Sequence, residues 1–179
     1  MKLSILSAIS FLLFSCGNET QKSKNSIETV VKQSSKMDEL KIAASRLRGG
    51  GSIKSIELVG ETVNIIYVSS YEEYKRLNPQ SILTETDLST YWESGDAIQK
   101  ALIDGAVRIM KKLNFVNEVS IVLPYKNEVY EIFVVKSELE KFIGKDFETI
   151  LKNWDELFSD PYVYDKEGRH KFFQKFGKK

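Results

Sequence analysis

The spacing of apolar residues along the chain alternates between a helical and a strand period. Residues 27–47 repeat apolar side chains every three to four positions, which predicts an amphipathic helix that ends at three consecutive glycines. Later segments rich in β-branched and aromatic residues, separated by polar turns, predict two pairs of strands. These strands cover residues 53–59, 63–69, 116–123 and 129–135. A short helical pattern follows each pair, at residues 71–77 and 138–143.

The two strand–strand–helix segments are similar in sequence. At an offset of 66 residues, Ile66 falls on Ile132 and Tyr67 falls on Phe133. One interpretation is a single element used twice, and the alternative is that hairpins followed by a capped helix look alike. Helix capping signals occur at four starts. They are Ser69-x-x-Glu72, Thr84-x-x-Asp87, Ser137-x-x-Glu140 and Asp146.

The longest helical pattern lies between the two segments, over residues 85–113. Its apolar face is wide enough for a helix that lies across a sheet. Gly95 marks a bend or break in this helix, and Gly105 allows a close approach to the strands. The tail predicts a helix over residues 147–158, stopped by Pro161, and a short basic and aromatic helix from Arg169 to Phe176.

These elements together predict an α+β fold. Two β-hairpins would form one four-stranded antiparallel sheet, covered by the long helix and flanked by additional N- and C-terminal helices. Residues 27–179 would form a single globular domain. In pattern alone the arrangement resembles small envelope modules such as PepSY-type domains, a likeness that carries no function.

The first sixteen residues have a different pattern, with Lys2 followed by an almost unbroken apolar run. This layout is that of a secretory signal peptide, and the run is shorter than a membrane-spanning helix. Its ending, Leu13-Phe14-Ser15-Cys16, resembles a bacterial lipobox. The resemblance identifies the chain as a bacterial lipoprotein precursor and implies cleavage before Cys16 and attachment of acyl chains such as palmitate to that residue. The alternative is an ordinary secretory signal with an incidental cysteine.

The predicted organisation is therefore a signal peptide over residues 1–15, a lipidated Cys16 with a flexible tether over residues 16–26, and the globular domain. Gly17, in place of an acidic residue after the cysteine, favours the outer membrane in the proteobacterial sorting scheme. The expected location is the cell envelope, anchored in a membrane with the domain on the periplasmic or surface face.

Charge and cysteine content narrow the classes of function. The chain has 26 basic and 25 acidic residues, and cleavage would remove Lys2 alone among them. The balance that remains excludes a bulk nucleic-acid binder, which carries a strong basic excess. Cys16 is the one cysteine, so a lipidated domain would hold no disulfide. The basic C-terminal helix is interpreted as packing on the acidic helix 146–158, with an anionic membrane, nucleic acid or an acidic partner as the alternatives.

No residue pattern predicts catalysis, a metal site or a cofactor. His170 is the one histidine and has basic neighbours, and no G-x-S-x-G motif is present. Glu93 and Asp96, three residues apart, would share a helix face and are the candidates for a carboxylate-dependent hydrolase. The alternative is a solvated helix face, which is what charged residues at this spacing usually indicate. Asp160 and Asp165 lie in a turn-rich loop, where local turn hydrogen bonds are favoured over a calcium ion.

Two segments carry paired tyrosines that could form a binding surface, a role in which exposed tyrosine is favoured. The candidates are Tyr71, Tyr74, Tyr162 and Tyr164. The alternative is that their rings close the edges of the core. The leading interpretation is a non-catalytic binding or assembly module whose partner is another envelope protein or a glycan. The alternatives are a hydrolase of envelope or surface glycans, and a carrier with an apolar pocket between the long helix and the sheet.

Overall fold

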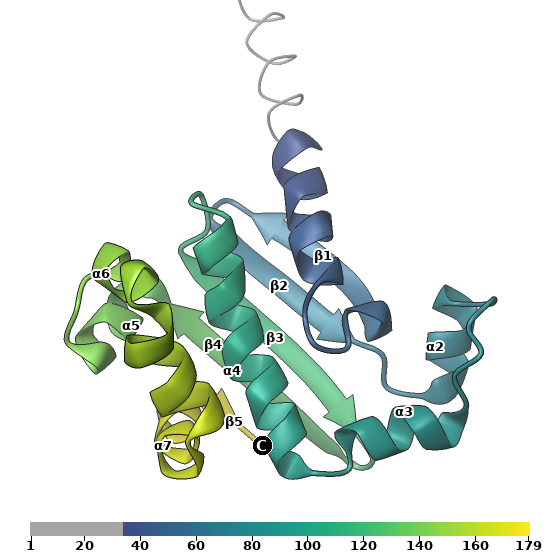
Figure 1. The fold of residues 1–179 in the computed structure, drawn as a ribbon. Coiled ribbons are helices and arrows are strands. Elements are labelled where there is room, and N and C mark those ends of the chain that lie inside the picture. Colours follow the sequence, from purple (N-terminus) through teal and green to yellow (C-terminus); the bar gives the residue numbers. More distant parts are fainter. Residues whose placement is uncertain (1–33) are drawn as a thin grey trace, which may run out of the picture. The chain divides into compact units, whose positions relative to one another are not determined.

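A mixed five-stranded sheet organises the part of the chain that the structure describes, residues 34–179 of a computed structural model (Figure 1). The strands follow one another in chain order across the sheet. They are β1 (Ile53–Val59), β2 (Thr62–Tyr67), β3 (Glu118–Tyr125), β4 (Glu128–Val135) and β5 (Gly177–Lys178). The α+β class is confirmed. Cys16, the predicted signal peptide and the tether lie outside the described residues.

The prediction of a purely antiparallel sheet is wrong at its centre, because β2 and β3 run parallel. Val63 pairs with Val119 and Ile65 with Ile121 in this ladder. A parallel pair needs a long crossover, and the chain between β2 and β3 supplies one in the form of three helices. The remaining strand pairs are antiparallel. The fifth strand was not predicted; it is a two-residue piece of the tail beside Glu131 and Ile132 of β4.

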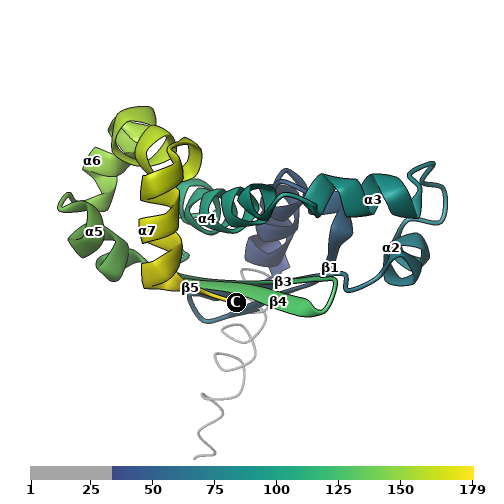
Figure 2. The same ribbon diagram turned by 90° about the horizontal axis from the view of Figure 1, so that it is seen from below.

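The described helices gather on one face of the sheet, as Figure 2 shows. Side chains of the strands alternate accordingly, so that Val63, Ile65 and Tyr67 of β2 are buried beneath the helices. The two hairpins, which are similar in sequence, differ in which of their aligned residues are buried. Ile66 is 39% exposed where its counterpart Ile132 is 1% exposed, and Tyr67 is buried where Phe133 is half exposed. An offset of 66 therefore aligns residues on opposite faces, which argues against a repeated structural unit.

The predicted long helix is broken, as the position of Gly95 indicated. α3 (Glu85–Trp92) ends at Glu93, and α4 (Gly95–Lys112) begins after Ser94, whose hydroxyl accepts the Ala97 N–H. α3 starts with a full capping box between Thr84 and Asp87, as the sequence predicts.

α4 lies across the centre of the sheet and carries most of its apolar face into the core. A Cβ at Gly105 would lie 3.1 Å from Cδ1 of Ile121 on β3, so the predicted close approach is confirmed. On another face of α4, the buried Asp104 accepts two hydrogen bonds from Arg108, at 2.7 and 3.2 Å. Arg48 lies 3.8 Å from the same carboxylate, which ties the loop after the first helix to α4.

The short helices after the hairpins differ from their predicted capping patterns. α2 (Tyr71–Leu77) is capped by Ser70, one residue later than predicted, with its hydroxyl accepting the Glu73 N–H. α5 (Lys136–Ile143) has no side-chain cap, and Glu140 accepts the Phe147 N–H at the next helix instead. That next helix, α6 (Phe147–Lys152), is capped by Asp146 as predicted.

The tail continues through Pro161, where the sequence predicts a stop. A wide π-type helical segment, η2 (Asp155–Tyr164), precedes α7 (Lys166–Phe176). Within it the Asp165 N–H donates to the carbonyl of Asp160, five residues back, and this wider turn tolerates the missing proline N–H. The buried Arg169 donates to the carbonyls that end η2 and forms an ion pair of 2.8 Å with Asp96.

The basic tail does not pair with the acidic residues of segment 147–158 in the ion pairs found among residues 34–179. Lys175 and Lys178 instead face Glu138 of α5 and Glu131 of β4, at 4.0 and 2.7 Å. Within the described residues, no helix combines the length and apolar character needed to cross a bilayer.

Candidate functional site

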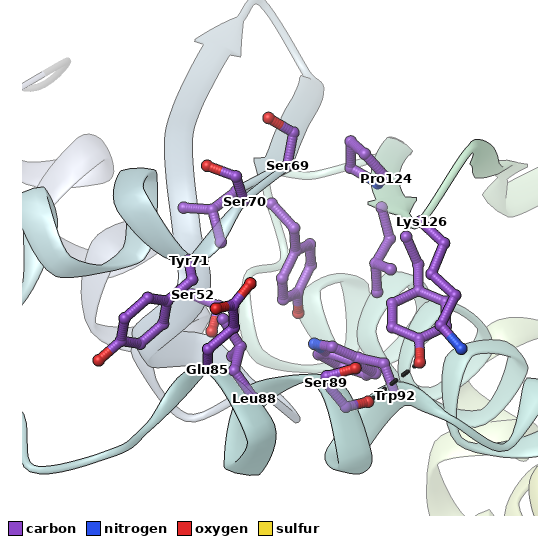
Figure 3. A pocket seen from close by; sticks show the side chains of 14 residues that line it. Ser52, Ser69, Ser70, Tyr71, Glu85, Leu88, Ser89, Trp92, Pro124 and Lys126 are labelled. Atoms are coloured by element: carbon purple, nitrogen blue, oxygen red, sulfur yellow. Dashed lines mark hydrogen bonds between the residues drawn. The ribbon is translucent and has the colours of Figure 1, made fainter.

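A pocket of about 160 Å³ opens where the parallel strands β2 and β3 end and α3 passes over them (Figure 3). β2 contributes Tyr67 and the three residues after it, and β3 contributes Leu123 to Tyr125. The carboxyl ends of neighbouring parallel strands are a common place for ligand sites in open sheets, because the chain leaves the sheet there and exposes loops and helix starts. The pocket therefore lies where it does because β2 and β3 run parallel, which the sequence did not predict.

Aromatic rings form the walls of the pocket. The rings of Tyr67 and Trp92 meet edge to face, with centroids 5.9 Å apart. Tyr91 also contacts the indole edge to face, at 4.5 Å between centroids. Tyr71 and Tyr125 complete the aromatic lining. Edge-to-face contacts fix ring orientation, so the walls are held in place before any ligand arrives.

Gly49 allows the indole to occupy this position. The residue has a φ of +67°, and a Cβ there would lie 2.5 Å from Cζ2 of Trp92 and 3.4 Å from Cε1 of Tyr67. The backbone of the triple-glycine turn therefore supports the back of the wall. The 3₁₀ turn that follows, η1 (Gly50–Ser52), places the buried Ser52 in the lining.

The Tyr67 hydroxyl is engaged in a hydrogen bond within the protein. It donates to the carbonyl of Arg48 at 2.8 Å, and burial raises the pKa of the phenol above its ordinary value. The Tyr125 hydroxyl donates to the carbonyl of Ser89 at 3.1 Å, the bond drawn in Figure 3. Both phenols are thus held in place by backbone carbonyls and form part of the pocket wall.

Several polar groups of the lining, unlike these two phenols, make no hydrogen bond with the described residues, and those of Trp92 and Glu85 are two of them. The Trp92 side chain is 5% exposed, yet no hydrogen bond within residues 34–179 uses its indole N–H. Figure 3 shows this nitrogen turned toward the side of the pocket where Glu85 lies. The Glu85 carboxylate likewise forms no hydrogen bond or ion pair with the described residues. A donor and an acceptor are thus both available to a ligand.

The opposite side of the pocket carries a positive charge. Lys126 has a φ of 55° at the β3–β4 turn, and its ammonium lies 5.2 Å from the ring centroid of Tyr125. Figure 3 shows Lys126 and Glu85 on opposite sides of the hollow. A ligand therefore meets the Glu85 carboxylate and the Trp92 N–H on one side and the Lys126 ammonium on the other.

The four tyrosines chosen from sequence do not form one surface. Tyr71 lines the pocket and its hydroxyl donates to the Leu83 carbonyl, whereas Tyr74 is buried beside Ser81. Tyr162 packs between Phe142 and Phe172 in the core of the C-terminal helices. Tyr164 is 57% exposed and contacts Arg48, away from the pocket lining.

The two carboxylates considered for hydrolysis, Glu93 and Asp96, lie on different helices and have different contacts. The helix break places Glu93 at the end of α3 and Asp96 in the first turn of α4, where Asp96 pairs with Arg169. Neither residue lines the pocket.

The remaining titratable candidates make local contacts. His170 is exposed, with its Nε2 3.0 Å from Nε2 of Gln174. Asp165 caps α7 by accepting the Gly168 N–H at 2.7 Å. Among residues 34–179 no group of three or more histidine, cysteine or carboxylate side chains is arranged to hold a metal ion.

The pocket was missed in the sequence because its residues come from four separated segments. The signals that exist are weak: Trp92 only widens an apolar face, and Glu85 is one of several acids near a helix start. No protein-family model matches the chain, and the searches of curated proteins and of solved structures return no match.

Proposed function

We propose that this protein is a lipid-anchored cell-envelope lipoprotein whose globular domain is a non-catalytic binding module. Acylated Cys16 would hold the chain in the membrane, and the tether over residues 16–26 would place the domain above the lipid surface. The pocket at the ends of β2 and β3 would receive one ring-sized group of a larger envelope component.

The observation that carries the binding role is the unpaired indole N–H of Trp92 in an aromatic pocket. No described residue accepts from this N–H, so a ligand acceptor can bind it directly, and a hydrogen bond of this kind contributes about 0.5–1.5 kcal/mol. Few convergent polar groups within apolar walls are the usual composition of a small-ligand site.

Binding is favoured over hydrolysis because of the number of carboxylates. Glycoside hydrolysis uses two acids that flank the scissile bond. Glu85 is the one carboxylate among the residues lining the pocket, and Asp96 is engaged by Arg169 elsewhere. The pocket can hold a group but has no second acid with which to cleave it.

The binding role is tested by photo-crosslinking in intact cells. A photoreactive phenylalanine analogue replaces Tyr71 at the pocket, and the matched control carries the same analogue at the exposed Tyr164. We expect a discrete adduct from position 71 and none from position 164. No adduct at position 71, or the same adducts at both positions, would contradict a binding function for the pocket.

The anchor is tested separately by fractionation of cells. Cys16→Ala should move the protein from the membrane fraction to the soluble fraction, because the acyl chains are its proposed anchor. Ser15→Ala is the matched control, since it keeps a small residue before the cysteine and should leave the protein in the membrane fraction. Membrane association of Cys16→Ala would refute lipid anchoring.

A further inference from the structure

We infer that the group bound in this pocket is a single pyranose ring, contributed by a glycan. The inference rests on the proposed binding function and adds the chemical class of the ligand. It follows from the size of the pocket, the nature of its walls and the pair of uncommitted polar groups.

The size of the pocket limits the ligand to one ring. A cavity of about 160 Å³ is close to the roughly 150 Å³ that accommodates a benzene molecule in a protein interior. Pockets for whole drug-sized molecules are larger, about 300–1,000 Å³. The remainder of a longer ligand would lie outside, along the open mouth beside α2 and the β3–β4 turn.

The walls suit a ring with both apolar and polar surface. Tyr67 and Trp92 line the pocket with aromatic rings held against each other, and the electron-rich faces of aromatic rings attract the C–H groups of a saturated ring. A pyranose offers such C–H groups on its faces and hydroxyl groups around its edge. The aromatic surfaces and the polar groups of this pocket are therefore used by the same ligand.

The polar groups discriminate among ring-sized ligands. The Trp92 N–H is a donor only, and the ionised Glu85 carboxylate is an acceptor only. A sugar hydroxyl both donates and accepts, so neighbouring hydroxyls satisfy Trp92 and Glu85 together. A hydrocarbon ring offers a hydrogen bond to neither group, and it would displace water from the indole N–H without replacing the bond that the water makes.

An alkylammonium ligand is disfavoured although aromatic walls often bind one. It has no acceptor for the Trp92 N–H. The Lys126 ammonium would also repel it, which offsets the attraction of the Glu85 carboxylate in the same lining.

Binding is measured by fluorescence in the full mature chain carrying Trp154→Phe. Trp92 and Trp154 are the two tryptophans of the protein, so this variant reports on the pocket alone. The protein is held in a detergent without a sugar headgroup. The probes are the methyl pyranosides of glucose, galactose, mannose and N-acetylglucosamine, with choline and phenol as the competing classes.

We expect at least one pyranoside to change the Trp92 emission saturably in the millimolar range, and no saturable change with choline or phenol. Glu85→Gln should weaken that binding about tenfold, because a charge-assisted hydrogen bond is lost. Glu93→Gln is the matched control: it removes an exposed carboxylate of the same helix end outside the pocket, and should bind as the parent does.

The inference is overturned if no pyranoside binds, if choline or phenol binds in their place, or if both glutamate variants behave alike. Its failure is distinguishable from failure of the binding function. An adduct at position 71 that is a protein without sugar, together with no pyranoside response, would preserve the binding module and reject the glycan. Absence of both signals would reject both.

Discussion

Substituting Gly49 tests whether the triple-glycine turn supports the aromatic wall. Gly49→Ala places a methyl group 2.5 Å from Cζ2 and 2.8 Å from Cη2 of Trp92, where carbon atoms normally keep about 3.5–4.0 Å. It also puts an alanine at a φ of +67°, a left-handed conformation that costs a residue with a Cβ about 1–2 kcal/mol. Both effects act on the same residue and add.

The expected loss of stability is about 2–5 kcal/mol. Forcing extra atoms into a packed region costs about 1–3 kcal/mol, and the backbone cost of about 1–2 kcal/mol is added to it. For a chain of this size each kcal/mol lowers Tm by about 2–4 °C, so we expect a decrease of about 4–20 °C. The assay is thermal unfolding followed by circular dichroism, with Trp92 emission recorded in the Trp154→Phe background.

Gly51→Ala is the matched control because it changes the same turn. A Cβ at Gly51 meets no atom within 4 Å, and its φ is not in the left-handed region. We expect a Tm within a few degrees of the parent. A small increase in Tm is consistent with this, because alanine restricts the unfolded chain more than glycine does. The reasoning is refuted if Gly49→Ala unfolds at the same temperature as Gly51→Ala with unchanged Trp92 emission.

Three further substitutions test other contacts of the fold. The Lys54 ammonium and hydrogen bonds from Ser69 lower the pKa of Glu73 to about 2, below its ordinary 4.5. Because the pKa of Glu73 is lower in the folded state than in the unfolded state, its ionisation stabilises the fold above pH 4.5, and this stabilisation is lost as the pH falls toward 2. The Tm values of the parent and of Glu73→Gln should therefore converge between pH 4.5 and pH 2. A Tm difference that stays constant over this range contradicts the expectation. Gly168→Ala should strongly destabilise the protein in urea unfolding, because a Cβ would overlap the Pro161 carbonyl oxygen. Arg169→Met should cost several kcal/mol by the same measurement, since it leaves the carbonyls that end η2 without their donor; an unchanged midpoint would contradict either expectation.

Local features of the sequence determined where most elements begin and end. Thr84 and Asp87 start α3 and Asp146 starts α6, because each cap is satisfied by backbone groups only three residues away. The break near Gly95 was also predicted from a local feature, because a glycine within a helical pattern marks a possible bend or break. Strand and helix periods identified both hairpins and the helices around them, since burial on one face imposes its period directly on the sequence.

Only the tertiary structure decided how these elements combine. The alternation in β2 and β3 is the same whether they pair parallel or antiparallel, so the strand pattern leaves their direction open. Pro161 within η2, the added strand β5 and the Arg169–Asp96 ion pair likewise depend on partners distant in sequence. The pocket follows from that arrangement: Glu85, Trp92 and Tyr67 share one hollow because two parallel strands end side by side beneath α3, and no spacing along the chain encodes their proximity.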